Sequence, residues 1–169
     1  MREGWSVCEK ITNNKVINIV IAGLGGQGVL LASDILADAA FRSGSDVKKS
    51  EIHGMSQRGG SVSSDVRFGA KVLSPMIPAG QADFLVCLSE DQVEVNKHVL
   101  SPKGVLISAA QIDENTLENK RSVNVALLGM LSKHLSISQE HWTSAIKAGL
   151  AEKLHQANLQ AFEQGRNKN

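Results

Sequence analysis

The chain has 169 residues, of which 42% are apolar and 21% are charged, and its formal net charge is +1. This length and composition are typical of one globular domain with its own core. Acidic and basic residues are nearly balanced and form no long basic run, which argues against binding to nucleic acid or to a membrane surface. No apolar stretch approaches the roughly 20 residues that span a bilayer, and residues 1–15 lack the apolar region of a secretory signal. We therefore expect a cytoplasmic protein.

The sequence contains two cysteines, Cys8 and Cys87. Two thiolates are too few for an iron–sulfur cluster or a structural zinc site in this chain, and these two are far apart in the sequence. Cys87 lies in the apolar run DFLVCLS, where a small buried side chain is a better interpretation than a reactive thiol. We expect no metal site in this chain, and any metal used in redox chemistry would belong to a partner.

The first predicted element is a strand at residues 15–22 (KVINIVIA), whose continuous apolar run indicates burial on both faces near the middle of a parallel sheet. After the next glycines, apolar side chains recur at helical spacing, which predicts a helix lying on the sheet. These side chains are Val29, Ala32, Leu36, Ala39 and Ala40. Asp38 and Arg42 are spaced to pair along this helix, and Gly44 is a suitable C-terminal cap.

Further along the chain, strands and helices alternate as in a parallel α/β sheet. Strands are predicted at 45–52, 83–89 and 104–110, and a short amphipathic helix at 90–100. The interval 53–80 breaks the alternation, because its two extended segments, 61–69 and 70–78, suggest a hairpin with each other.

The last third of the sequence is helical. Helices are predicted within 122–136, 138–150 and 151–165, with Ser138 as the N-cap of the second. The predicted fold class is therefore α/β: an open, Rossmann-like, mostly parallel sheet with flanking helices, a hairpin insertion and a helical C-terminal region.

The segment GLGGQG, residues 23–28, has the G-x-G-x-x-G spacing of a dinucleotide fingerprint at Gly23, Gly25 and Gly28. A strand that enters a glycine turn and then a helix presents unpaired backbone N–H groups and the positive end of the helix dipole at one point. Such a turn suits a phosphate. The alternative is a tight connection packed against neighbouring backbone.

NAD is the first ligand to consider for this turn. Glu51 lies at a suitable distance to hold the ribose hydroxyls. However, a dinucleotide-binding unit continues into a crossover helix, whereas this chain continues into HGMSQRGGSV and a predicted hairpin. We therefore expect that the chain does not bind NAD.

A second loop, HGMSQRGG, places Arg58 before Gly59 and Gly60. The planar guanidinium suits phosphate or carboxylate, and the loop should emerge at the same carboxyl edge of the sheet as the glycine turn. The alternative is a surface hairpin with a solvated arginine. His53 could contact a ligand, but a structural or surface role explains it better.

No catalytic constellation is visible elsewhere. Asp65 and Arg67 alternate on a predicted strand, and we expect them to be solvent-facing or paired rather than catalytic.

Four stretches carry a resemblance to a known family: GLGGQGVLLASDILADAA, EIHGMSQRGGSVSSDVRFG, VLSPMIPAGQADFLVCLS and NLQAFEQG. Together they resemble the gamma-type subunit of the 2-oxoacid:ferredoxin oxidoreductases, and within that family they are most similar to the beta subunit of the indolepyruvate enzymes. The resemblance covers nearly the whole chain beyond residue 15.

The resemblance implies a subunit of a larger enzyme that oxidatively decarboxylates a 2-oxoacid and transfers the acyl group to coenzyme A. Thiamine diphosphate and 4Fe–4S clusters would belong to a partner catalytic subunit, which passes electrons to ferredoxin. In the related single-chain pyruvate enzymes, the domain that is similar to this chain helps bind coenzyme A, through a glycine turn and a Lys-Lys-Ser-Gly-Gly loop. In this sequence the lysines of that loop fall on Ser56 and Gln57, and its serine on Arg58.

The expected coenzyme-binding residues come from the two loops. They are Gly23, Gly25, Gly26, Gln27, Gly28, Ser56, Gln57, Arg58, Gly59 and Gly60. We expect an N-terminal extension at 1–15, a gamma-type domain at 16–169, and self-association or an exposed apolar docking face in the isolated chain. The alternative function is a stand-alone binding module for a nucleotide or other phosphorylated ligand.

Overall fold

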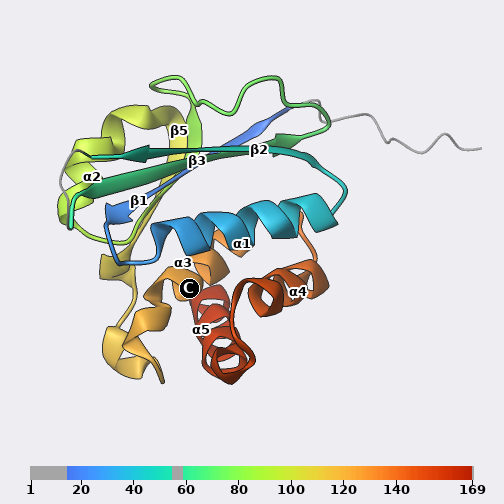
Figure 1. The fold of residues 1–169 in the computed structure, drawn as a ribbon. Helices are drawn as coiled ribbons and strands as arrows, with labels where there is room; N and C mark the ends of the chain where they lie inside the picture. Colours follow the sequence, from blue (N-terminus) through green and yellow to red (C-terminus); the bar gives the residue numbers. More distant parts are fainter. Residues whose placement is uncertain (1–14, 55–58, 169) are drawn as a thin grey trace, which may run out of the picture.

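Strand β1 (Ile17–Leu24) lies inside a five-stranded sheet with the order β2-β3-β1-β4-β5 (Figure 1). Its residues 19–22 are almost completely buried because both faces of the sheet are covered here. Ile19 and Ile21 belong to the larger core beneath the sheet, whereas Val20 and Ala22 belong to a smaller cluster above it. The prediction of a central strand buried on both faces is confirmed.

The computed structural model describes residues 15–54 and 59–168. The other strands are β2 (Asp46–His53), β3 (Ser61–Gly69), β4 (Ala82–Cys87) and β5 (Leu100–Ser108). The helices are α1 (Val29–Arg42), α2 (Asp91–Asn96), α3 (Val123–Ser132), α4 (Gln139–Gly149) and α5 (His155–Asn167). Within these residues, no helix is both long and apolar enough to cross a membrane.

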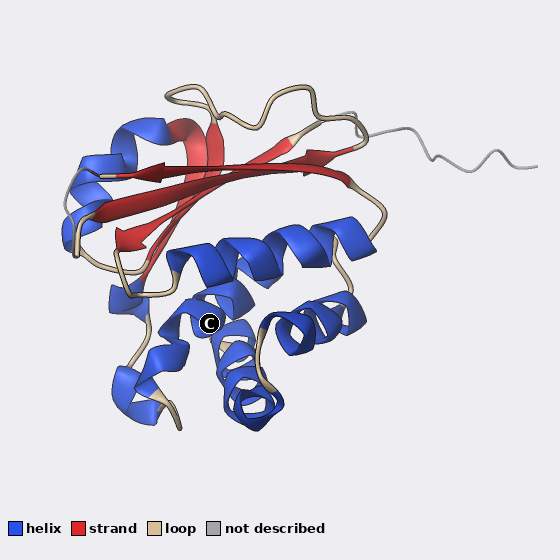
Figure 2. Ribbon diagram, in the orientation of Figure 1, coloured by secondary structure: helices blue, strands red, loops and turns tan. Residues whose placement is uncertain are grey.

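The two faces of the sheet are covered unequally (Figure 2). Helix α1 lies directly on one face, with α3, α4 and α5 beneath it, and α2 and the segment 70–81 lie on the other. Helix α1 ends as predicted: Asp38 pairs with Arg42 at 2.8 Å, and Gly44 follows the helix with a φ of 90°. Ser138 caps α4, accepting a hydrogen bond from the main-chain N–H of His141.

The sheet confirms the α/β class but is more mixed than predicted. Strand β1 is parallel to β4, and β4 to β5, whereas β3 is antiparallel to both β1 and β2. The predicted hairpin has other arms, because 61–69 pairs with Asp46–His53 and not with 70–78. Strand β3 thus lies between β1 and β2, where a dinucleotide-binding unit would have those two strands adjacent.

Segment 70–81 is an irregular strap and not the strand we predicted for 70–78. Pro75 and Pro78 lack the N–H groups that a strand needs, and β3 holds the strap through side chains instead. Asp65 Oδ2 accepts from the N–H of Ile77 at 2.9 Å, and Arg67 Nη1 donates to the carbonyl oxygens of Ser74 and Met76 at 2.8 and 3.0 Å. Asp65 is buried, so these two residues are structural and Asp65 is not solvent-facing.

Helices α3 and α5 cross at two glycines. A Cβ atom at Gly129 would lie 2.0 Å from the carbonyl oxygen of Phe162, and one at Gly165 would lie 1.9 Å from that of Ala126. Any side chain here would therefore force the helices apart. The N-terminus of α3 lies beneath the carboxyl edge of the sheet (Figure 1), where Asn124 contacts Gly28.

Candidate functional site

The glycine turn joins the end of β1 to α1 at the carboxyl edge of the parallel strands. Gly26 and Gly28 have φ values of 91° and 84°, a backbone conformation that favours glycine. The side chain of Gln27 closes the turn, since its Oε1 accepts from the N–H of Leu24 at 2.7 Å. A Cβ atom at Gly23 would lie 2.9 Å from that same Oε1, so Gly23 is needed for the packing of Gln27.

Helix α1 begins at Gly28 without a side-chain cap and without an acidic residue in its first turn. Its first N–H groups therefore lack intrahelical acceptors, and its dipole places partial positive charge at the turn. This part of the site is as the sequence predicted.

The second loop meets the first through main-chain atoms. The N–H of Gly25 donates to the carbonyl oxygen of Gly60 at 2.9 Å, and a Cβ atom at Gly25 would lie 3.5 Å from the nitrogen of Gly59. The end of the hairpin is fixed by a 2.7 Å hydrogen bond from the N–H of Gly54 to the carbonyl oxygen of Ser61. Ser56, Gln57 and Arg58 lie outside the described residues. The structure thus places the described glycines of the two loops together at one edge.

The N-terminus of α3 forms another wall of the site. Asn124 Nδ2 donates to the carbonyl oxygen of Gly28 at 3.2 Å, and Asn124 Oδ1 accepts from the N–H of Val125 at 2.9 Å. A cavity of about 600 Å³ lies between this end of α3 and the glycine turn, and Lys120 and Arg121 line it. We did not predict these cations from the sequence, because more than ninety residues separate Asn124 from Gly28. The sequence did contain a signal for these cations. The basic pair stands directly before an apolar helix that has no acidic residue in its first turn.

His53 and Glu51 lie beside the site and not at its centre. Glu51 Oε1 is 2.7 Å from Lys49 Nζ, and Glu51 Oε2 is 3.5 Å from His53 Nε2. The hydrogen bond from Lys49 lowers the pKa of Glu51, although burial opposes this shift. Glu51 is therefore engaged with its own strand, and β3 separates that strand from β1. His53 lines a second, more apolar cavity of about 410 Å³ on the other side of the turn.

Cys87 is fully buried at the end of β4, as predicted. Burial raises the pKa of its thiol to about 12. The side chain therefore stays protonated near neutral pH and suits neither nucleophilic chemistry nor metal ligation.

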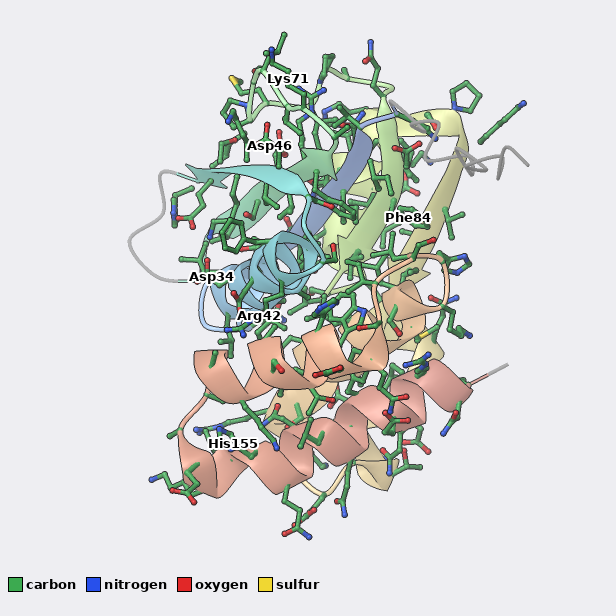
Figure 3. The ribbon with its side chains drawn as sticks, turned by 90° about the vertical axis from the view of Figure 1, so that its right-hand side faces the viewer. Asp34, Arg42, Asp46, Lys71, Phe84 and His155 are labelled. Atoms are coloured by element: carbon green, nitrogen blue, oxygen red, sulfur yellow. The ribbon has the colours of Figure 1, made fainter. Side chains whose placement is uncertain are left out.

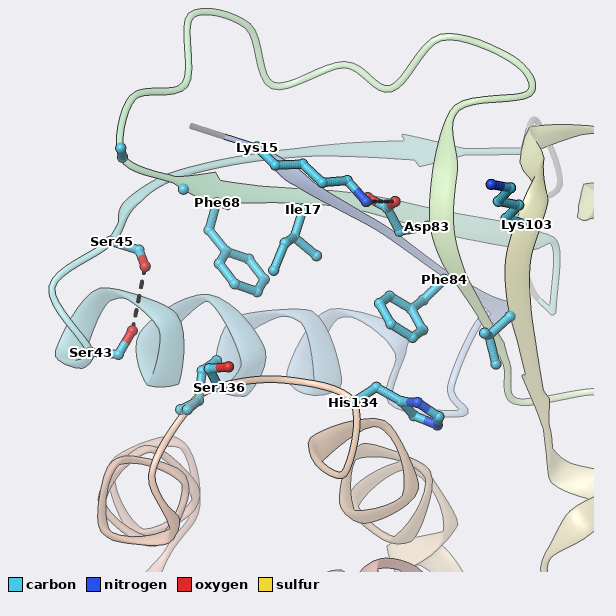
Figure 4. A pocket seen from close by; sticks show the side chains of 14 residues that line it. Lys15, Ile17, Ser43, Ser45, Phe68, Asp83, Phe84, Lys103, His134 and Ser136 are labelled. Carbon is cyan, nitrogen blue, oxygen red and sulfur yellow. Dashed lines mark hydrogen bonds and ion pairs between the residues drawn. The ribbon is translucent and has the colours of Figure 1, made fainter. Parts of the chain in front are cut away.

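The opposite, amino edge of the strands carries a groove of about 570 Å³ (Figures 3 and 4). Two of its charged groups are engaged in the fold: Lys15 Nζ pairs with Asp83 Oδ1 at 2.7 Å, and Asp83 Oδ2 accepts from the N–H of Asn18 at 2.9 Å. The ring of His134 rests against Phe84, with ring centroids 5.5 Å apart. Open α/β sheets bind ligands at the carboxyl edge, so we assign the candidate site to the glycine turn.

Fold and site together define a class: an open α/β domain with a glycine turn at its carboxyl edge, against which a hairpin loop and a second helix N-terminus are packed. The sequence model of the family described as pyruvate ferredoxin/flavodoxin oxidoreductase matches residues 18–116 and 107–168. The chain belongs to this family.

Individual relatives of this chain are also subunits of 2-oxoacid oxidoreductases. An indolepyruvate oxidoreductase subunit IorB from Archaeoglobus fulgidus is 32% identical, over 89% of this chain and 94% of that protein. The gamma subunit of a keto/oxoacid ferredoxin oxidoreductase from Geobacter sulfurreducens has the same fold, with a TM-score of 0.77 and 23% identity over 91% of this chain and 96% of that one. The predicted similarity to gamma-type subunits and to indolepyruvate enzymes is confirmed.

A longer solved chain also has this fold. It is a 2-oxoglutarate:ferredoxin oxidoreductase from Magnetococcus marinus with 2-oxoglutarate, coenzyme A and succinyl-CoA bound. The match has a TM-score of 0.75 and 22% identity, and it covers 90% of this chain but 30% of the other. In that enzyme, this fold is one part of a larger polypeptide.

Proposed function

We propose that this chain is the gamma-type subunit of a complex that oxidatively decarboxylates a 2-oxoacid of the indolepyruvate type to an acyl-CoA and reduces ferredoxin. Its own role is to help bind coenzyme A and to assemble the complex. Thiamine diphosphate and the 4Fe–4S clusters are held by the partner catalytic subunit. The names of the relatives support a subunit role, and the protonated, buried Cys87 supports cluster ligands elsewhere.

The observation that carries the coenzyme A assignment is the hydrogen bond from the N–H of Gly25 to the carbonyl oxygen of Gly60. It holds together two loops that each suit a phosphate group, at the edge where such sheets bind ligands. The backbone leaves room for a bulky group, because a Cβ atom at Gly26 or Gly59 would have none of the described residues within 4 Å. When bound, coenzyme A supplies the thiol that accepts the acyl group. The coenzyme A in the Magnetococcus marinus structure adds support for this ligand class.

The face of the sheet opposite α1 supports an assembly role. Leu73 and Met76 of the strap are 83% and 61% exposed, and Ile52 of β2 is 54% exposed. Ile52 pairs with Ser63, and Ser63 pairs with Ala22, so the side chains of Ile52, Ser63 and Ala22 point to the same face of the sheet. This is the face that carries α2 and the strap. Exposed apolar side chains gathered on one face favour a subunit interface there.

Arg58→Ala in the assembled complex tests coenzyme binding. A charge-assisted contact contributes about 1.5 to 3 kcal/mol, so the variant should weaken the apparent affinity for coenzyme A about tenfold to a hundredfold. Decarboxylation on thiamine diphosphate, measured as the coenzyme-independent half-reaction, should be nearly unchanged. Unchanged affinity would remove Arg58 from the site, and loss of both activities would make its loop an assembly element.

Purification of the untagged chain from its native extract tests the subunit role. We expect it to co-purify with a larger subunit that carries thiamine diphosphate and iron–sulfur absorbance, in a fraction that reduces ferredoxin with a 2-oxoacid. The isolated chain should be colourless and inactive. A monodisperse chain that carries its own tightly bound nucleotide would support the alternative, a stand-alone binding module.

A further inference from the structure

The cavity beside the glycine turn is lined by two cations, Lys120 and Arg121. Both side chains are exposed, and within residues 15–54 and 59–168 neither is paired with a carboxylate. Gly26, Gln27 and Gly28 form the facing wall of the same cavity. A fixed turn thus faces two charges that the rest of the described fold does not use.

Two helices begin at this cavity, and their positive ends point to it together. Gly28 and Leu31 of the α1 end line it, as do Val123 and Asn124 of α3. Neither helix has an acidic residue in its first turn or a side-chain cap. The hydrogen bond from Asn124 to Gly28 fixes one helix end against the other. The N–H of Val125 is already bonded to Asn124 Oδ1, so the first turn of α3 contributes its dipole more than a full set of free N–H groups.

Ser122 provides a further polar group at this end of α3. It is 1% exposed, and its hydroxyl has no hydrogen-bond partner among the described residues. A buried hydroxyl without a partner is costly, and most such groups in native proteins are satisfied by something. Ser122 does not itself line the cavity, whereas its chain neighbours Arg121 and Val123 do, so its hydroxyl is not counted among the groups that face the ligand.

The neighbouring cavity at the same edge has the opposite charge. It shares Gln27, Leu88 and Glu114 with the first, and adds the carboxylates of Glu90 and Asp113. Glu114 therefore stands at the boundary between a basic and an acidic region. An anion at this edge would be attracted to the side of Lys120 and Arg121 and repelled from the side of Glu90.

We infer that the cavity between the glycine turn and the N-terminus of α3 binds the phosphate groups of the ligand, with Lys120 and Arg121 as its cations and Glu114 limiting its extent. The chemical class is a diphosphate-bearing ligand. The identification of that ligand as coenzyme A rests on the function proposed above, whereas the phosphate site itself does not.

Calorimetric titration of the full chain at about 0.15 M ionic strength, where the Debye length is about 8 Å, tests this inference, with coenzyme A and inorganic pyrophosphate as separate probes. The double variant Lys120→Ala/Arg121→Ala should bind both probes at least about tenfold more weakly than the wild type. The charge-matched control is Lys71→Ala/Lys103→Ala, which removes two exposed cations from the amino-edge half of the molecule. It should bind within about twofold of the wild type, because charges beyond a Debye length are screened.

Glu114→Gln provides a test of opposite sign. Removing the carboxylate at the boundary should raise the affinity for both probes about twofold to fivefold, as expected for an exposed charge. A purely structural role for this segment would not produce tighter binding.

Each outcome separates the two proposals. Equal binding of both probes by the wild type and the double variant, or no binding of either probe by the wild type, overturns the phosphate site. If pyrophosphate binding requires the two cations but coenzyme A does not bind, the phosphate site stands and the coenzyme A assignment fails. If coenzyme A binds the double variant undiminished while Arg58→Ala weakens it, coenzyme binding stands and this inference fails.

Discussion

Asn124 and Gly28 are joined by a 3.2 Å hydrogen bond from Asn124 Nδ2 to the carbonyl oxygen of Gly28. A Cβ atom at Gly28 would lie 2.4 Å from that same Nδ2. Gly28 is therefore required twice, by its φ of 84° and by the side chain packed against it. These two causes can be separated experimentally.

Gly28→Ala should destabilise the protein by about 1–2 kcal/mol through its left-handed backbone, with an added cost for displacing Asn124. Asn124→Ala removes the second cost, so the double variant should be less destabilised than the sum of the single variants by roughly 1 kcal/mol. Urea unfolding measures the four free energies. Gly26→Ala is the matched control, because Gly26 has a φ of 91° but none of the described residues lies within 4 Å of its Cβ position. It should show no coupling with Asn124→Ala. Strict additivity for Gly28 would contradict the packing argument.

Gly129→Ala and Gly165→Ala should each destabilise the protein by at least about 2 kcal/mol, because an added Cβ would overlap a backbone carbonyl of the facing helix. In an open helix the same change would stabilise by about 1 kcal/mol, so the sign of the effect is diagnostic. Gln160→Ala on the exposed surface of α5 serves as the control and should be nearly neutral. A neutral or stabilising result at either glycine would show that the two helices can separate without cost.

We expect the buried thiol of Cys87 to make the free energy of unfolding fall at alkaline pH. Its folded pKa of about 12 lies above its ordinary value of 9.0, so the unfolded state releases its proton first as pH rises. The stabilisation is complete below about pH 9 and declines above it, by up to about 1.4 kcal/mol per pH unit. Unfolding of Cys8→Ser and Cys8→Ser/Cys87→Ala should be compared between pH 8 and 10.5. The difference in unfolding free energy should shrink as pH rises, and a constant difference would show that the thiol is not shielded.

We expect the buried carboxyl of Asp65 to make the free energy of unfolding rise as the pH falls below neutral. Burial raises the pKa of its carboxyl, although the N–H of Ile77 opposes this shift. The folded state therefore holds the proton at a higher pH than the unfolded state, and ionised Asp65 costs stability near neutral pH. Relative to Asp65→Asn, the wild type should gain unfolding free energy as pH falls from 7 to 4, with a plateau below the unfolded pKa. Parallel profiles would contradict this expectation.

The core elements of the fold could be predicted because their patterns are local. Strand β1 is a continuous apolar run, and the buried face of α1 has helical spacing, so both follow from residues close together in the sequence. The arms of the hairpin could not be predicted this way. The apolar residues of 70–78 resemble a strand, but two prolines remove ladder donors, and Asp65 and Arg67 bind the segment through side chains instead.

The candidate site was predictable in part for the same reason. The glycine turn is a local motif, and the position of the second loop follows from strand direction, so the approach of Gly25 to Gly60 could be anticipated. Lys120 and Arg121 could not, since their place beside the turn depends on how α3 packs. The contact that ties α3 to the turn, from Asn124 to Gly28, joins residues far apart in the sequence, so only the assembled structure reveals it.

The β2–β3 hairpin has a consequence for how this family can diversify. Eight consecutive residue pairs, from Asp46–Gly69 to His53–Val62, keep the two strands in register, and the hydrogen bond between Gly54 and Ser61 closes the ladder. Residues inserted or exchanged between Gly54 and Ser61 would therefore change the loop that meets the glycine turn without shifting a single strand pair. Mutation can thus change the loop beside the glycine turn while selection on folding stability acts on a separate part of the chain.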